Sequence, residues 1–493
     1  MTSRMTSTAA AVAAVMLMLL GVLAVPLPAS ATSTDLSSRL ETEQGPTTIL
    51  GGGDHFFVKF GADAAFGIVW GTNDTPNNVY FVAIKARYLG MAQVYDTDGK
   101  LVEANHTVKI YTLYAIKLDD MLEFNDTNGN GVAPYYRMYD NGNFTGDYVS
   151  FEPLYKSVDL KTAWTASNVT TADSGTARTW TFSLSAKNLS YSPLNAYTGP
   201  AGDNMLNDFS LTFHLEANMV QVDNATIPQW RITVTRGMMG NMMWFSNAER
   251  APDLIMSGKM LTYDVKWDSS FEGWDFDAAN ANPLLVLEFD AIVGNYIPNA
   301  MTAWMEMKMI QTMIQEMNEN GAMTCRSGAS DVDIDSSTGV YTTPKTVTQP
   351  SLTFGGENTR IGKFAWVSNV TVDGVQTQLR TQLMAGVPVW AIGANGAMFH
   401  GFAVVGGMAY PGGALIVHDP TFSSDALVDL GSKDNVFPVG LLAVGLIIAV
   451  AVIAIAVVVS LTQKKPGQKA PQNYERSRGS SQPGEWAKYY NKK

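Results

Sequence analysis

The stretch Phe209–Ala217, FSLTFHLEA, alternates apolar and polar side chains without a break. Successive side chains of a strand point to opposite faces, so this alternation predicts a strand with one buried face and one solvated face. Strands of this kind are typical of antiparallel sheets that cover a core. The buried face would consist of Phe209, Leu211, Phe213, Leu215 and Ala217.

The same alternation recurs on both sides of this stretch. Three further strands would bury Trp180, Phe182 and Leu184, then Trp230, Ile232 and Val234, and then Leu261, Tyr263, Val265 and Trp267. The turn dipeptides Asp373-Gly374 and Asn395-Gly396 lie between apolar runs and predict two hairpins. We therefore expect a mainly β fold, a large antiparallel β-sandwich at 51–297 that a β-meander at 359–422 completes.

One helix is expected to pack on this sandwich. The segment 298–321 begins with Pro298, repeats Met every four residues from Met301 to Met317, and ends at Gly321. Residues 322–358 are rich in Ser, Thr, Gly and Asp and predict a loop-rich excursion. Residues 32–50 are polar and predict a flexible lead-in.

The two ends of the chain predict secretion and a membrane anchor. Val436–Leu461 has 26 residues without a charge, and as a helix it would reach roughly 39 Å, enough for a single transmembrane helix. Residues 1–31 resemble a signal peptide, with Arg4 before an apolar run and Ala29-Ser30-Ala31 at the cleavage site.

The charges on either side of the predicted span set its direction. Residues 462–493 contain eight Lys or Arg against two Glu and predict a disordered cytoplasmic tail. Residues 423–435 would then be a short stalk outside the membrane. In layout the chain resembles type I single-pass surface glycoproteins of prokaryotes, including archaea, although no motif identifies a particular family.

Composition restricts the partners of the outer part. The whole chain has a formal charge of −12, which disfavours nucleic acid as a partner and favours divalent cations. Cys325 is the single cysteine, so no internal disulfide is possible and a large core must provide the stability. Eight sequons predict N-glycosylation at Asn73, Asn105, Asn125, Asn143, Asn168, Asn188, Asn224 and Asn369.

Two acidic loops are candidate calcium sites. The run from Asp126 to Gly131 resembles the first half of a calcium loop, because oxygen-bearing side chains alternate before a glycine. Arg137 stands where a bidentate Glu is expected, and an Asn/Gly turn without metal explains the same pattern. The candidate ligands are Asp126, Asn128 and Asn130 in the first loop, and Asp331, Asp333 and Asp335 in the second.

A third candidate is a carbohydrate site in the segment Trp267–Asp277, since exposed rings stack on sugars and carboxylates bind their hydroxyl groups. The alternative is that the rings belong to the core and the acids are merely solvated. The candidate residues are Trp267, Phe271, Glu272, Trp274, Asp275 and Asp277. Three of them, Glu272, Asp275 and Asp277, are also carboxylates of the kind that glycosidases use as acid and base.

The order Cys325, His400 and Asp419 resembles the C-terminal half of a family of cysteine peptidases. This resemblance implies Cys325 as nucleophile, His400 as base and Asp419 as the residue that orients the base. Against it, the nucleophile of that family opens a helix, whereas 326–343 has the composition of a loop.

These features predict a membrane-anchored extracellular glycoprotein for adhesion, glycan binding or cell-surface assembly. A membrane-tethered polysaccharide hydrolase is the alternative, and a receptor for metal ions or solutes is the third possibility. Calcium is the one cofactor that the sequence suggests.

Overall fold

The computed structural model describes most of the region between residues 40 and 429. The described ranges are 40–60, 64–140, 143–197, 199, 205–236, 243–297, 326–327, 330–331, 333–334, 341–342, 351–354, 362–392 and 398–429. The predicted signal peptide (1–31), helix (298–321), transmembrane span (436–461) and tail (462–493) lie outside these ranges. The described residues include no helix that is long and apolar enough to cross a membrane.

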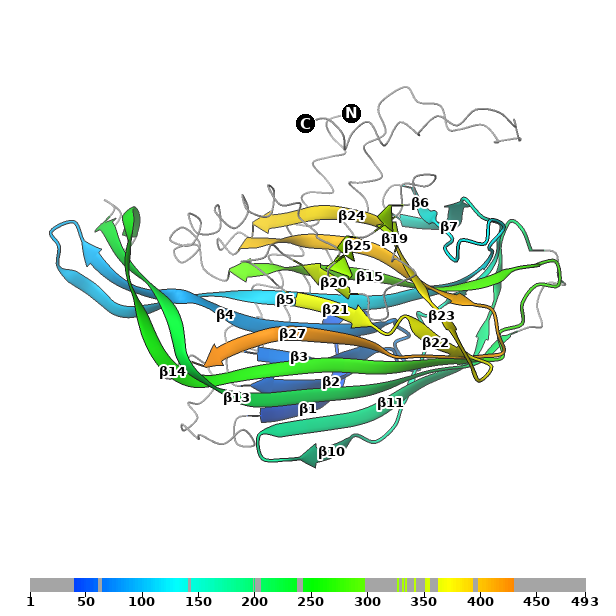
Figure 1. Ribbon diagram of the computed structural model, residues 1–493, viewed down its shortest axis with the longest axis horizontal. Coiled ribbons are helices and arrows are strands. Elements are labelled where there is room, and N and C mark those ends of the chain that lie inside the picture. Colours follow the sequence, from blue (N-terminus) through cyan, green and yellow to red (C-terminus); the bar gives the residue numbers. More distant parts are fainter. Residues whose placement is uncertain are drawn as a thin grey trace, which may run out of the picture.

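The described part is mainly β, and its one helix is the short 3-10 turn η1 at Ile49–Gly51. Hydrogen bonds link 23 of the described strands into one network, in which nearly all neighbours are antiparallel (Figure 1). The exception is a parallel pairing of 229–234 with 91–96. The prediction of a mainly β, antiparallel fold is therefore confirmed for these residues.

Two groups of strands form the body of the molecule. The first group, in spatial order, is β1 (Leu40–Thr47), β2 (Gly53–Phe60), β3 (Ala64–Trp70), β4 (Val79–Asp96), β5 (Leu101–Asn125), β15 (Pro283–Ile297), β25 (Met398–Pro411) and β24 (Arg380–Ile392). The second is β10 (Thr170–Asp173), β11 (Ala177–Ser190), β13 (Met205–Arg236), β14 (Met243–Glu272), β27 (Pro420–Asp429), β21 (Gly362–Trp366) and β20 (Ser351–Phe354).

Aromatic side chains fill the space between the two groups. The Phe66 ring stacks on Tyr263 with 4.6 Å between centroids, and the Phe81 ring lies 4.1 Å from Trp267. Each pair joins a strand of the first group to β14 of the second. Two sheet layers with a shared aromatic core are consistent with the predicted sandwich.

The alternation read from the sequence is confirmed wherever the side chains are described. The inward residues of β13 from Phe209 to Ala217 are fully buried, as are those of β11 and β14 that were expected in the core. The dipeptide Asp373-Gly374 has φ of 49° and 80° and joins β22 (Asn369–Val372) to β23 (Val375–Gln378) as an antiparallel hairpin.

The structure differs from the sequence prediction at both borders of the sandwich. Leu40–Thr47, expected within the flexible lead-in, is β1 and pairs with β2 along its whole length. Residues 423–429, expected in the stalk, belong to β27, which pairs with β14 and β21. Polar composition misled the prediction for β1, because this edge strand exposes most of its side chains.

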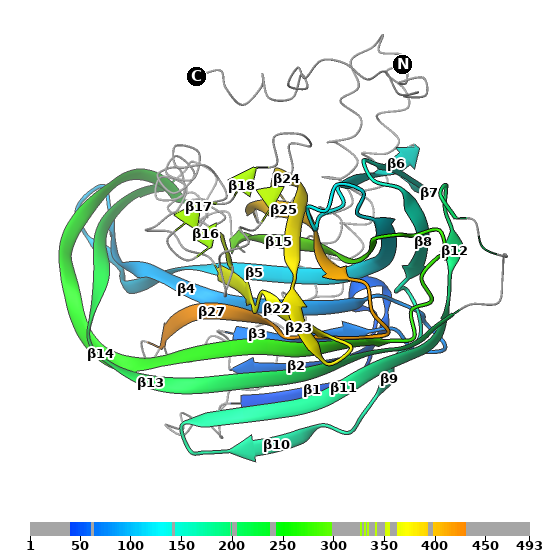
Figure 2. The same cartoon turned by 45° about the vertical axis from the view of Figure 1, so that its right-hand side comes forward.

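A small hairpin lies apart from the large network. It consists of β6 (Tyr135–Asp140) and β7 (Asn143–Ser150), which pair with each other as a separate two-stranded sheet. Both views place this hairpin at the end of the molecule opposite the long extension of β13 and β14 (Figures 1 and 2). No backbone ladder among the described strands joins it to the large sheet, so side chains hold it in place.

Candidate functional site

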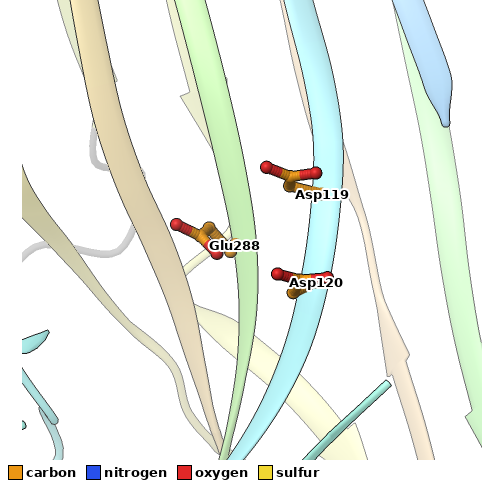
Figure 3. Close-up of side chains that lie close together, drawn as sticks. All are labelled: Asp119, Asp120 and Glu288. Atoms are coloured by element: carbon orange, nitrogen blue, oxygen red, sulfur yellow. The ribbon is translucent and has the colours of Figure 1, made fainter. Parts of the chain in front are cut away.

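A β-bulge between β5 and β15 brings three carboxylates together. Leu287 is opposite Met121 and Phe289 is opposite Leu118, so Glu288 alone faces both Asp119 and Asp120. A bulge of this kind lets two consecutive side chains share a face that a regular strand would separate. One carboxylate oxygen from each of the three residues lies within 4.8 Å of the other two (Figure 3).

Two cations and a fourth acid complete what we call the acidic cluster, which consists of Asp119, Asp120, Glu288 and Asp290 with Lys117 and Arg137. All four carboxylates are buried, Glu288 completely. If all four are ionised, the two basic groups leave the cluster with a net charge of −2. A buried charge excess of this size is costly unless protons or another cation compensate for it.

Arg137 comes from the β6–β7 hairpin and lies among the carboxylates. Its Nη2 is 2.6 Å from Oε2 of Glu288 and also contacts Oδ2 of Asp119, while its Nη1 donates to Oδ2 of Asp290 at 3.4 Å. Asp120 lies farther away, with 3.9 Å from its Oδ2 to Nη2. Asp120 is therefore the carboxylate that Arg137 compensates least.

Lys117 and Tyr148 are further partners of the acids. Nζ of Lys117 lies 2.6 Å from Oδ1 of Asp119. The hydroxyl of Tyr148, on β7, donates to Oδ2 of Asp120 at 2.7 Å. Oε1 of Glu288 has no hydrogen-bond partner within the described part of the chain.

Burial and charge separate the pKa values of these acids. Burial raises the pKa of Asp120 to about 7, with the neighbouring Asp119 charge adding to the effect. Burial also raises the pKa of Glu288 and of Asp290, although Arg137 opposes it in both. For Asp119, burial is outweighed by Arg137 and Lys117, so its pKa is lowered. The cluster can thus gain or release a proton near neutral pH.

The all-oxygen donor set is of the type that Ca²⁺ and Mg²⁺ prefer. However, the guanidinium of Arg137 already lies between Asp119, Asp120 and Glu288. A divalent ion would have to displace this side chain and the hairpin that carries it. In the geometry observed, the cation that lies between these three carboxylates is Arg137.

On the outer face of the same hairpin, the side chains that the structure describes are apolar. Tyr135, Arg137 and Tyr148 point inward, and their neighbours along the strands point to solvent. We call the exposed set the hairpin face; it consists of Tyr136, Met138, Val149 and Phe151, which are 38%, 38%, 50% and 54% exposed. Tyr136 pairs across the strands with Val149, and its ring centroid lies 6.0 Å from that of Phe151.

The structure corrects the interpretation of the predicted carbohydrate site. Trp267, Phe271 and Trp274 are 5% exposed or less, so none of these rings offers a face to a sugar. Trp274 instead donates from Nε1 to Oε2 of the buried Glu123 at 2.9 Å. Of the carboxylates, Asp277 is buried, and only Glu272 and Asp275 are exposed.

The first predicted calcium loop is closed by its own hydrogen bonds. Asp126 accepts from the backbone N–H of Asn130 at 3.1 Å and of Gly131 at 2.8 Å. Asn128 accepts from Asn130 at 2.9 Å and donates from Nδ2 to the buried Glu152 at 2.5 Å. Asn130 in turn accepts from the N–H of Val132 at 2.9 Å. The oxygens of the predicted ligands are thus already used by the turn.

The second predicted calcium loop is only partly described. Asp331 lies in β17 (Ser330–Asp331) and Asp333 in β18 (Asp333–Ile334), and their side chains are not described. Asp335 lies outside the described residues. Of the residues in the peptidase resemblance, Cys325 also lies outside the described residues. Asp419 forms an ion pair with Lys266, with 2.9 Å between Oδ2 and Nζ.

The predicted glycosylation sites fall into three groups. Five of the asparagines are exposed: Asn73, Asn168, Asn188, Asn224 and Asn369. Asn125 is half-buried, and its Oδ1 accepts from the N–H of Asn282 at 3.2 Å. Asn105 and Asn143 lie in β5 and β7, where their exposure is not described.

Sequence reasoning missed both the acidic cluster and the hairpin face. Arg137 and Glu288 were not considered together because nothing in the sequence brings them into contact. The one available signal was the alternation in Tyr135–Asp140, YYRMYD, which places Arg137 on the same face as Tyr135. Comparison of the chain with models of protein families gave no match, and no characterised protein matched it.

Proposed function

We propose that the chain is a membrane-anchored cell-surface protein that binds a partner protein through the hairpin face, in adhesion or in surface assembly. The observation that carries this proposal is the two-sided hairpin. Its inner face is fixed by Arg137 and Tyr148, and its outer face displays two aromatic and two aliphatic side chains to solvent. A β-sandwich ectodomain would be the rigid support of this hairpin.

The composition of the hairpin face favours a protein over a glycan. Aromatic residues and Met are enriched at the centres of protein interfaces, where a few such side chains supply most of the binding energy. Exposed apolar side chains that gather on one face also mark interaction sites more often than single ones do. A sugar site would combine the rings with several polar groups, whereas Met138 and Val149 add further apolar surface.

The other functions that the sequence suggested remain proposals with less support. A hydrolase would depend on Glu272 and Asp275, because Asp277 is buried. Calcium binding at Asp126, Asn128 and Asn130 would have to compete with the hydrogen bonds of the turn.

Site-specific photo-crosslinking in the native cell tests the proposal. A photoreactive residue at Val149 is expected to form a cross-link to a discrete protein, and the Phe151→Ser substitution should abolish it. Val375 is the matched control, because it is 67% exposed at a turn away from the hairpin. Equal cross-linking from both positions would contradict the proposal. If the protein binds glycans on an array and the Phe151→Ser variant does not, the carbohydrate alternative would be favoured.

The membrane anchor is tested in the same cells. Deletion of residues 436–493 is expected to move the protein from the membrane fraction into the medium, because the uncharged run is lost. A truncated chain that stays in the membrane fraction would rule out this segment as the anchor.

A further inference from the structure

We propose that the acidic cluster is a proton-controlled latch that holds the β6–β7 hairpin on the sheet and so sets the position of the hairpin face. This inference rests on the proposed function in one respect: moving the hairpin face matters to the cell because that face binds a partner. The latch itself concerns contacts between the hairpin and the strands β5 and β15. Its test can therefore succeed or fail independently of any partner.

The attachment of the hairpin makes such a latch effective. An isolated two-stranded hairpin is marginally stable in water, and side chains alone hold this one on the large sheet. At its base, Tyr135 stacks on Phe124 with 5.5 Å between ring centroids, and Gln382 bonds both the N–H and the C=O of Ala133 at 2.7 Å. Tyr148 also lies in a buried apolar cluster with Leu122 and Val286. The polar contacts of the inner face are those of Arg137 and Tyr148 with the acids.

Charged or titratable groups of five strands face the cluster. The groups that face the four acids are Tyr80 of β4, Lys117 of β5, Tyr135 and Arg137 of β6, Tyr148 of β7 and Asp159 of β8 (Leu154–Asp159). Only Lys117 and Arg137 among them are cationic. A proton on the least compensated acid therefore relieves repulsion without breaking either ion pair.

Asp120 is the least compensated acid, and its environment decides whether closure of the hairpin is stronger at low or at high pH. In the closed hairpin, burial raises its pKa to about 7, whereas in an opened hairpin water would return the pKa towards its usual value near 4. The closed state thus binds a proton that the open state releases. By linkage, the proton on Asp120 stabilises closure most below about pH 4, and this stabilisation is lost as the pH rises from about 4 to about 7.

Hydrogen exchange of the full-length protein, corrected for the intrinsic pH dependence of exchange, measures this opening. Protection of residues 132–151 is expected to fall between about pH 4.5 and 7, by up to about tenfold per pH unit for the Asp120 proton, whose contribution levels off above about pH 7. Asp120→Asn keeps the size of the side chain and removes one titrating group, so its protection should fall less steeply with pH than that of the wild type, in which Glu288 and Asp290 titrate as well. The matched control Asp98→Asn, in an exposed turn, should retain the wild-type profile.

Tyr148→Phe provides a second test if Asp120→Asn fails to fold. Loss of the hydroxyl removes a hydrogen bond that lowers the pKa of Asp120, so the fall in protection should move to higher pH. A flat profile in the wild type, or the same profile in wild type and Asp120→Asn, would overturn the latch. Cross-linking at Val149 tests the partner, whereas hydrogen exchange tests the latch. Either result can therefore be positive when the other is negative.

Discussion

Arg137 and Glu288 lie 151 residues apart in the chain, and their side chains meet in the interior with 2.6 Å between Nη2 and Oε2. Glu288 is completely buried, and Arg137 is the hairpin cation that pairs with the β15 acids Glu288 and Asp290. Removing one partner of a buried pair leaves the other charge without compensation, which costs more than the pair itself contributes. The stability of this protein should therefore depend strongly on Arg137.

Arg137→Leu is expected to lower the free energy of unfolding by about 3–5 kcal/mol at pH 8. The loss should be smaller at pH 5, because Asp120, Glu288 and Asp290 have raised pKa values and hold protons there more readily. Urea unfolding at the two pH values measures both effects. The control Arg178→Leu breaks a partly exposed pair with Asp173 at 3.0 Å and should cost about 1 kcal/mol or less. Equal losses for the two variants at pH 8 would contradict the buried role of Arg137.

The sequence predicted the body of the fold well because burial there follows a period of two. The run from Phe209 to Ala217 specifies its buried face residue by residue, and the pattern in Tyr263–Trp267 does the same for β14. The prediction failed at β1, where an edge strand has mostly exposed side chains and no apolar face to recognise. Residues 298–325 lie outside the described part, so the predicted helix stays a prediction.

The acidic cluster had no comparable signal. Asp119 and Asp120 are adjacent, so a regular strand would place them on opposite faces. They share a face because of the bulge opposite Glu288, and a bulge depends on the partner strand rather than on local composition. Trp267 shows the opposite problem, because the same residue fitted both a core pattern and a sugar-binding pattern until its burial was known.

Trp267→Ala is expected to destabilise the protein by about 3–5 kcal/mol, since it removes a fully buried ring that packs on Phe81. Glu272→Ala, five residues along and exposed, should change the stability by about 0.5 kcal/mol or less. Chemical unfolding of the two variants measures the difference. A Trp267→Ala protein of wild-type stability that has lost affinity for a polysaccharide would restore the carbohydrate site.

Asp126→Ala is expected to cost about 1–3 kcal/mol, because the N–H groups of Asn130 and Gly131 lose their acceptor. The loss should be of similar size with excess EDTA and with millimolar Ca²⁺, since the hydrogen bonds close the turn by themselves. Thermal unfolding under both conditions compares the variant with the wild type. A loss that is confined to the calcium samples would instead support the calcium loop that the sequence suggested.

Glycan occupancy is expected to follow the exposure of the sequon asparagines. Asn73, Asn168 and Asn369 are exposed and should be modified. Asn125 should not be, because its Oδ1 accepts from Asn282 and the hydroxyl of Thr127, the third residue of its sequon, contacts Glu152. Mass spectrometry of glycopeptides from the native protein measures each site. Asn125→Gln should also destabilise the fold, whereas Asn168→Gln should not. A glycan on Asn125 in the folded protein would contradict the prediction and show that this end of β5 is open to solvent.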